Sequence, residues 1–336
     1  MRLKEALLYQ VKQEVVECNL CWHRCVIKPG RRGICGVREN RSGTLYSLVY
    51  GRVSAEHIDP VEKKPLFHFL PGTLTCSIAT VGCNFKCLHC QNHTLSQTGA
   101  GVEHIPSTYR SPEEIVAAAV QGGCRSISYT YSEPTIFFEY AYDCCQAARA
   151  KGLKNIFVSN GYMSREAAEM IVPFLDAINI DIKAFSEPFY QDICGGSMQH
   201  VLDNVRFFRA RNIWVEVTTL IIPGLNDTDE QLRSIAEFLV EVDPDICWHV
   251  SAFSPSYLMT DRPRTPAERL QSAREIGFAA GLNHVFTGNI RGQGGEDSNC
   301  PSCGKTLIQR SGFHVISNLL KSGACPYCSE PLAGVW

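Results

Sequence analysis

Apolar residues along the middle of the chain follow two alternating periods. From about residue 74 to residue 288, short apolar runs alternate with longer stretches that repeat an apolar residue every three or four positions. The runs predict strands, and the stretches between them predict helices. Strands are expected at 75–79, 126–131, 155–159, 177–182, 214–220, 248–252 and 284–287. Helices are expected at 112–121, 135–151, 164–174, 199–210, 228–240 and 266–280, with N-caps at Ser111, Ser164 and Thr265.

This alternation predicts the fold class. Strands that alternate with helices of this length form a parallel sheet with crossover helices. About six such repeats indicate an α/β fold with a partial (β/α)6 barrel over residues 73–289. An open, doubly wound sheet is the alternative.

The chain on either side of this core has a different pattern. Residues 1–17 have apolar positions near helical spacing and predict an amphipathic helix, and 45–53 resembles a strand of a small β-rich module. We assign these elements, with a proline-rich connector, to an N-terminal part at 1–72. The polar, Gly-rich stretch 289–299 predicts a linker, so the C-terminal part spans 290–336.

Composition narrows the class of protein. Hydrophobic residues make up 45% of the chain and charged residues 20%, as in an ordinary globular protein, and the net charge is −2. Without a run of basic residues, nucleic acid is not the expected partner. No apolar run reaches the length of a membrane span, and the first residues lack the apolar core of a signal peptide. We therefore expect a cytoplasmic protein, whose 17 cysteines are metal ligands more often than disulfides.

Three cysteines form the central motif. Cys83, Cys87 and Cys90 have C-x3-C-x2-C spacing and follow the first strand of the barrel, where α/β barrels keep their chemistry. Three thiolates on a [4Fe–4S] cluster leave one iron open for a substrate or cosubstrate. The alternative is a structural zinc site that His89, His93 or a distant cysteine completes.

Two further groups of four cysteines flank the core. The N-terminal group is Cys18, Cys21, Cys25 and Cys35. The C-terminal group is Cys300, Cys303, Cys325 and Cys328. The first predicts a zinc site or an auxiliary iron–sulfur cluster, and the second predicts a zinc-ribbon or rubredoxin-like module that binds zinc or iron. A non-catalytic scaffold with three metal modules is the alternative to an enzyme.

The central motif resembles the cluster motif of the radical SAM superfamily. Tyr131-Ser132-Glu133-Pro134 stands where the glycyl-radical-enzyme activases of that superfamily have Gly-Gly-Glu-Pro, although it lacks both glycines. Nearly the whole chain, including both groups of four cysteines, is similar to the radical SAM enzyme of the AmmeMemoRadiSam system. That family is associated with Memo-like and AMMECR-like proteins.

The resemblance implies a reaction and a set of site residues. The open iron of the cluster would bind S-adenosylmethionine, and reductive cleavage would give a 5′-deoxyadenosyl radical that abstracts hydrogen from an unidentified substrate. A glycyl-radical-enzyme activase of the pyruvate formate-lyase type is the narrower alternative. A reductant such as flavodoxin or ferredoxin is implied as a partner. The implied contacts to S-adenosylmethionine are Ser132, Glu133, Asn160, Asp181, Lys183 and His249.

Overall fold

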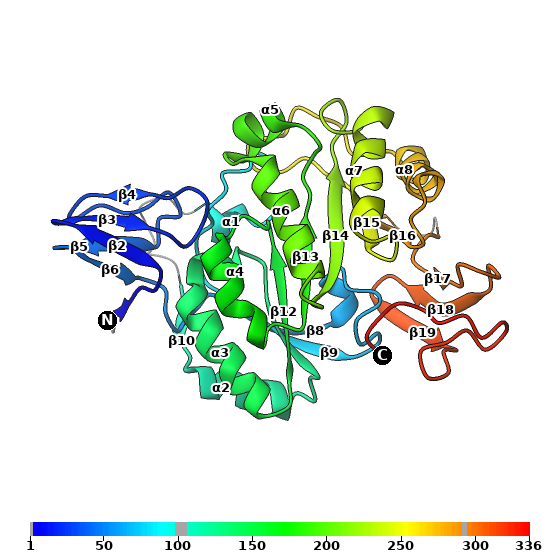
Figure 1. Ribbon diagram of the computed structural model, residues 1–336, viewed down its shortest axis with the longest axis horizontal. Coiled ribbons are helices and arrows are strands. Elements are labelled where there is room, and N and C mark those ends of the chain that lie inside the picture. Colours follow the sequence, from blue (N-terminus) through cyan, green and yellow to red (C-terminus); the bar gives the residue numbers. More distant parts are fainter. Residues whose placement is uncertain (1–2, 98–105, 291–293) are drawn as a thin grey trace. The chain divides into compact units, whose positions relative to one another are not determined.

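The computed structural model describes residues 3–97, 106–290 and 294–336 (Figure 1). The chain divides into two compact units. The first consists of Met1–Asp59, Leu74–Ile178 and Cys194–Gly196. The second consists of Pro60–Thr73, Asn179–Ile193 and Ser197–Trp336. The predicted division into three parts at 1–72, 73–289 and 290–336 follows other boundaries and stays a prediction.

An eight-stranded sheet forms the core, with strand order β16-β15-β14-β13-β12-β11-β9-β8. Its strands are β8 (Ala55–Pro60), β9 (Leu74–Ala79), β11 (Ser126–Tyr129), β12 (Lys154–Ser159), β13 (Ala177–Asp181), β14 (Trp214–Ile221), β15 (Cys247–Ala252) and β16 (Val285–Gly288). Strand β13 begins in the first unit and ends in the second. The pairs β9–β11 and β11–β12 are parallel, as are β14–β15 and β15–β16.

This strand order decides between the two predicted architectures. Every strand lies beside its predecessor among the strands of the sheet, so the order never reverses. A doubly wound sheet needs such a reversal, whereas a partial barrel does not. The α/β prediction is confirmed, and the doubly wound alternative is excluded. All residues of β11 and β15 are buried, as expected for strands covered by helices.

The six predicted helices are present. They are α2 (Pro112–Gln121), α3 (Phe138–Ala150), α4 (Arg165–Ile171), α6 (Met198–Arg209), α7 (Asp229–Val242) and α8 (Ala267–Ala280), and two short helices, α1 (His93–Ser96) and α5 (Glu187–Phe189), were not predicted. A 3-10 turn at Pro134–Phe137 precedes α3 and accounts for the early start predicted there. Within the described residues, we find no helix with the length and apolar character that crossing a bilayer requires.

Two of the three predicted N-caps are confirmed. Ser111 forms a capping box with Glu114, and the Ser164 hydroxyl accepts a hydrogen bond from the Ala167 amide. Thr265 does not cap α8. Its hydroxyl instead donates to the Ile221 carbonyl at 2.5 Å, because the chain here packs against the end of β14 before the helix begins.

The predicted N-terminal helix is wrong, because short strands replace it (Figure 1, dark blue). The strands are β1 (Lys4–Glu5), β2 (Tyr9–Lys12), β3 (Val15–Cys18), β4 (Val26–Ile27), β5 (Arg38–Arg41) and β6 (Thr44–Ser47). They form two three-stranded sheets, β2-β3-β4 and β1-β6-β5. Gln13 adopts φ +61° between β2 and β3, so a tight turn interrupts the apparent helical period. The strand predicted at 45–53 is divided between β6 and β7 (Arg52–Val53).

The C-terminal module is confirmed as a small β-sheet with its own core. Its strands are β17 (Ser298–Asn299), β18 (Thr306–Ser311) and β19 (His314–Asn318). Leu307, Ile308 and Leu332 form the core together with Cys300 and Cys325. The predicted linker at 289–299 includes 291–293, which lie outside the described residues, and its last two residues form β17.

Candidate functional site

Residues 83–90, which we call the cluster loop, follow β9 in the first unit. Gly82 makes the turn into the loop with φ +102°, a conformation that side chains disfavour. The Gly82 amide donates to the Leu95 carbonyl at 2.8 Å, so α1 is hydrogen-bonded to the turn at which the loop begins. The three cysteines therefore leave the carboxyl end of the first parallel strand, as the sequence predicts.

Cys83 and Cys90 of the cluster loop have hydrogen-bonding neighbours. The Phe85 amide lies 3.4 Å from Cys83 Sγ, and Asn160 Nδ2 lies 3.8 Å from the same sulfur. Cys90 Sγ lies 3.0 Å from the Ser96 hydroxyl, which itself donates to the Asn92 carbonyl at 3.0 Å. Hydrogen bonds to sulfur are one of the ways in which proteins tune iron–sulfur clusters. The donors to Cys83 Sγ are therefore compatible with a cluster ligand.

Glu133 organises the polar residues beside the loop. Its buried carboxylate accepts hydrogen bonds from Ser159 Oγ at 2.8 Å, from the Asn160 amide at 2.8 Å and from Thr135 Oγ1 at 2.6 Å. Burial raises the pKa of this carboxyl, while these donors act in the opposite direction. Glu133 thus joins the ends of β11 and β12.

Asn160 connects this carboxylate to the cluster loop. Its Nδ2 donates to Asn84 Oδ1 at 2.8 Å, and its Oδ1 accepts from the Tyr162 amide at 3.0 Å. Asn160 was predicted from the sequence, but Asn84 was not, because it lies between two cysteines of the motif and has no other signal in the sequence. In this structure, Glu133 and Asn160 support the loop.

Two buried polar atoms near the loop have no hydrogen-bond partner among the described residues. They are Asn84 Nδ2 and Ser132 Oγ. A buried polar group without a partner is costly, and proteins retain such groups where a ligand pairs with them. The residues present thus fit a cluster with a polar cosubstrate beside it.

The remaining predicted contacts lie in the second unit. Asp181 ends β13, and its carboxylate accepts from Lys183 Nζ at 2.7 Å. The Lys183 carbonyl accepts from Asn226 Nδ2 at 2.6 Å, and the Lys183 amide donates to the Tyr190 hydroxyl at 2.9 Å. This backbone anchoring leaves an opposite-charge pair at the carboxyl end of the strand, where the sequence predicts a ligand contact.

His249 lies within β15 and is buried. Its Nε2 is 2.6 Å from a Glu216 carboxylate oxygen, and its ring packs against Phe67 and Phe286, with centroids 4.8 and 5.3 Å away. Glu216 also accepts from the amides of Phe67 and His68 at 2.9 and 2.8 Å. The ring of His249 is therefore held by a carboxylate and two aromatic rings, and its contact to S-adenosylmethionine stays a prediction.

The N-terminal group of four cysteines gathers around the end of β3. Burial raises the pKa of Cys21 well above its usual range, and the neighbouring Cys18, Cys25 and Cys35 raise it further. The Cys18 amide donates to the Cys25 carbonyl at 2.9 Å. Cys18, Cys25 and Cys35 thus lie near enough to Cys21 to act on its thiol, whereas among the described residues only the C-terminal group has all four sulfurs within 4.8 Å of one another.

The C-terminal group of four cysteines has the geometry of a metal site. The four sulfur atoms all lie within 4.8 Å of one another. Cys300 Sγ is 3.5 Å from Cys328 Sγ, and Cys303 Sγ is 3.7 Å from Cys325 Sγ. Four thiolates at such distances fit one tetrahedral metal ion.

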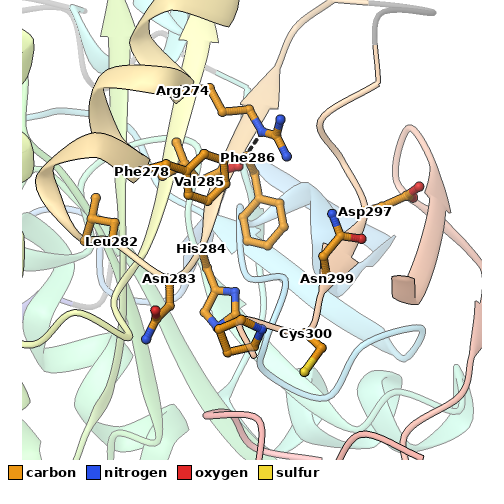
Figure 2. Close-up of a pocket in the computed structure, with 11 residues that line it drawn as sticks. Arg274, Phe278, Leu282, Asn283, His284, Val285, Phe286, Asp297, Asn299 and Cys300 are labelled. Carbon is orange, nitrogen blue, oxygen red and sulfur yellow. Dashed lines mark hydrogen bonds between the residues drawn. The ribbon is translucent and has the colours of Figure 1, made fainter. Parts of the chain in front are cut away.

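A cavity of about 220 Å³ lies beside this module in the second unit (Figure 2). Arg274 spans one side and donates from Nε to the Val285 carbonyl at 3.0 Å. His284 also lines the cavity; its Nε2 is buried without a hydrogen-bond partner among the described residues, and burial lowers its pKa to about 4. Cys300 lines the cavity, but none of the predicted contacts to S-adenosylmethionine does.

Comparisons with known proteins agree with this arrangement. Residues 77–239 match the model of the Radical SAM superfamily. An uncharacterized protein of Methanocaldococcus jannaschii is 42% identical over 334 residues, which are 98% of this chain and 99% of that protein. The pyruvate formate-lyase 1-activating enzyme of Escherichia coli is 20% identical over 47% of this chain and 65% of the enzyme.

A solved structure shows the same fold. Streptococcus suis SuiB bound to precursor peptide SuiA is similar with a TM-score of 0.51 at 14% identity, over 69% of this chain and 52% of that one. The matched family model contains the cluster loop as well as Glu133 and Asn160. An enzyme with an iron–sulfur cluster and S-adenosylmethionine as cofactors follows from these findings. The chain belongs to the radical SAM superfamily.

Proposed function

We propose that Cys83, Cys87 and Cys90 hold a [4Fe–4S] cluster and that S-adenosylmethionine binds beside it. The observation that carries this proposal is the pair of unpartnered polar atoms, Asn84 Nδ2 and Ser132 Oγ, together with a loop whose Cys83 sulfur already accepts hydrogen bonds. When bound, the cluster supplies the electron for reductive cleavage of S-adenosylmethionine. The radical so formed abstracts hydrogen from a substrate.

The residues of the chain have distinct parts in this proposal. Ser132 contacts the polar end of S-adenosylmethionine, because its hydroxyl is buried and unpartnered. Glu133 and Asn160 orient the cluster loop through Asn84. Asp181 and Lys183 bind the ribose hydroxyls and the carboxylate, for which one acceptor and one cation are suited.

The experiment that tests this function uses anaerobically reconstituted protein. The wild type is expected to bind four irons at the central site and to release 5′-deoxyadenosine from S-adenosylmethionine under strong reductant. Replacement of each loop cysteine by Ala should abolish both iron binding at that site and product formation. A protein that binds iron and gives no 5′-deoxyadenosine would contradict the proposal and favour the metal scaffold.

The relatives indicate which class of substrate to test first. Similarity to the pyruvate formate-lyase 1-activating enzyme and to a putative glycyl-radical enzyme activating enzyme of Methanocaldococcus jannaschii supports a protein substrate that receives the radical. A reductant such as flavodoxin serves as the electron donor, and Memo-like and AMMECR-like proteins are candidate partners from the family resemblance. Mixing each candidate with the active enzyme and recording electron paramagnetic resonance spectra tests this directly. A persistent radical on a partner supports activation, whereas its absence favours a small-molecule substrate.

We assign zinc to the C-terminal group of four cysteines. Two C-x2-C knuckles with sulfurs within 4.8 Å are typical of a closed structural site. The N-terminal group is assigned to the same kind of site or to an auxiliary cluster. Metal analysis of variants that lack one group at a time distinguishes zinc from iron at each position.

A further inference from the structure

The N-terminal group of four cysteines belongs to a segment, residues 18–37, that contacts the cluster loop within the first unit. His23 lies between Cys21 and Cys25, and its Nε2 is 2.7 Å from the Asn84 carbonyl oxygen. A carbonyl only accepts, so Nε2 carries the proton and donates. The cluster loop is therefore held by a side chain whose neighbours in sequence are cysteines of another group.

Aromatic packing strengthens this contact. The rings of His23 and Tyr162 have centroids 4.9 Å apart, and those of Tyr162 and Phe85 are also 4.9 Å apart. Tyr162 thus stands between the four-cysteine segment and the loop. Its own backbone is fixed, because its amide donates to Asn160 Oδ1 at 3.0 Å.

A second contact lies at the other end of the segment. A Cβ added to Gly82 would lie 2.6 Å from Val37 Cγ1 and 3.0 Å from the Cys35 carbonyl oxygen. Only glycine permits this approach, because a side chain would clash with both atoms. Gly82 also has φ +102°, a conformation that residues with a side chain rarely adopt. The residue that precedes Cys83 therefore rests directly on the backbone of Cys35.

Residues 194–196 also contact the loop. A Cβ added to Gly196 would lie 2.3 Å from the Phe85 ring, and the Lys86 amide donates to the Cys194 carbonyl at 2.7 Å. The residues that follow Asn84 are thus packed closely, so the loop depends on its neighbours for its conformation.

We propose that His23 is a positioning residue for the reaction, and that metal binding by Cys18, Cys21, Cys25 and Cys35 holds it in place. A metal held by these cysteines would fix the backbone on both sides of His23, whose imidazole holds the Asn84 carbonyl and thereby the cluster loop. This inference rests on the proposed function of that loop. It makes the N-terminal metal a determinant of how the cluster is presented to S-adenosylmethionine.

Hydrogen exchange of the loop amides in the reconstituted full chain tests the proposal. His23→Leu should accelerate exchange at Phe85 and Lys86 about tenfold, as expected for the loss of one buried hydrogen bond. Cys25→Ser should do the same by releasing the N-terminal metal. The double variant should add little, because both changes break one pathway. His23→Gln, which keeps a donor, should restore most of the protection.

Spectroscopy separates positioning from a general loss of structure. The His23→Leu variant should bind as much iron at the cluster loop as the wild type. The electron paramagnetic resonance spectrum of its reduced cluster with S-adenosylmethionine should differ from the wild-type spectrum. Arg24→Ala is the matched control, because Arg24 lies on the same segment but its side chain pairs with Glu166 of α4, at 2.8 Å, and not with the cluster loop. It should change neither readout.

Two outcomes overturn different claims. If His23→Leu has full iron content with wild-type exchange and spectrum, the positioning role is wrong. If the wild type binds no iron at the cluster loop, the proposed function is wrong, and exchange at Phe85 and Lys86 still decides whether His23 holds the loop.

Discussion

At the residue scale, Tyr131 shows how the site is shaped. It adopts φ +63°, which costs a non-glycine residue about 1–2 kcal/mol. The Gly-Gly-Glu-Pro segment to which this stretch is similar has glycine at the matching position, and glycine adopts positive φ without this cost. Its hydroxyl donates to the buried carboxylate of Asp59, which holds the ring in place. The turn that aims Ser132 and Glu133 therefore depends on this tyrosine.

Removal of that hydroxyl tests the dependence. Tyr131→Phe should lower the free energy of unfolding by about 1–2 kcal/mol, because Asp59 loses one donor while buried. Urea denaturation of metal-loaded protein measures the change. Tyr109→Phe is the control, since Tyr109 is 52% exposed and should change stability little. Equal stability of Tyr131→Phe and wild type would show that other contacts maintain the turn.

His284 makes a pH-dependent contribution to stability. Burial lowers its pKa from 6.5 to about 4, so the folded state favours the neutral ring. The contribution of His284 to the free energy of unfolding is complete above pH 6.5 and is lost as the pH falls through about 4. The whole contribution is about 3 kcal/mol. His284→Gln should therefore show a smaller loss of unfolding free energy between pH 7 and pH 5. Because acid also releases metal from both proteins, the difference between them is the informative quantity.

The sequence located the site residues better than it described their contacts. Glu133 and Asn160 were expected at strand ends, and they lie there. Their hydrogen bond to each other joins residues 27 positions apart, which depends on the register of β11 and β12. No local pattern contains that information. The contact between His23 and the Asn84 carbonyl, 61 positions apart, could not be predicted for the same reason.

At the element scale, the close packing of α8 on the sheet explains a glycine inside a helix. A Cβ added to Gly277 would lie 2.8 Å from Val285 Cγ2 and 3.1 Å from the Trp248 ring. Both neighbours are buried and cannot move aside easily. The helix therefore contains a residue of low helix propensity, because only glycine lets α8 approach β15 and β16 this closely.

The two opposing effects predict whether a substitution of Gly277 stabilises or destabilises the protein. Gly277→Ala gains about 1 kcal/mol of helix propensity but costs about 1–3 kcal/mol through overpacking. We expect net destabilisation of about 1 kcal/mol by urea denaturation. Glu275→Ala, at an exposed position of the same helix, should change the unfolding free energy by less than about 0.5 kcal/mol. Stabilisation by Gly277→Ala would mean that Trp248 repacks.

Long periodic elements were predictable, and short ones were not. Helix α2 has its predicted bounds because Ser111, Pro112 and Glu114 mark its start. The N-terminal strands are two to four residues long, too short to establish a period of two. The turn at Gln13, which pairs β2 with β3, also lacks a Gly or Asn-Gly signal.

At the scale of the whole molecule, the C-terminal module is integrated into the second unit by a buried network. Arg310 of β18 donates to the Phe67 carbonyl at 2.6 Å and to the Ser298 hydroxyl at 2.9 Å. The Leu70 amide donates to the Val335 carbonyl at 2.7 Å, so the module and the stretch 60–73 share backbone hydrogen bonds.

Loss of the C-terminal metal should therefore spread beyond the module. Cys325→Ser removes one of four ligands, and a small metal site provides much of the folding free energy of such a module. We expect faster amide exchange in 298–336 and also at Leu70 and Val335. Ser302→Ala, in the same knuckle, should leave exchange unchanged. Confinement of the effect to 298–336 would show that the network holds without metal.

The core of the C-terminal module includes two of its own metal ligands. Cys300 and Cys325 are each 2% exposed and pack with Leu307, Ile308 and Leu332. When a cell runs short of metal, such a module cannot stay closed, and an opened chain is what proteases cleave. The abundance of this enzyme should then follow the metal supply, so that copies lacking the ion are removed before they can consume S-adenosylmethionine.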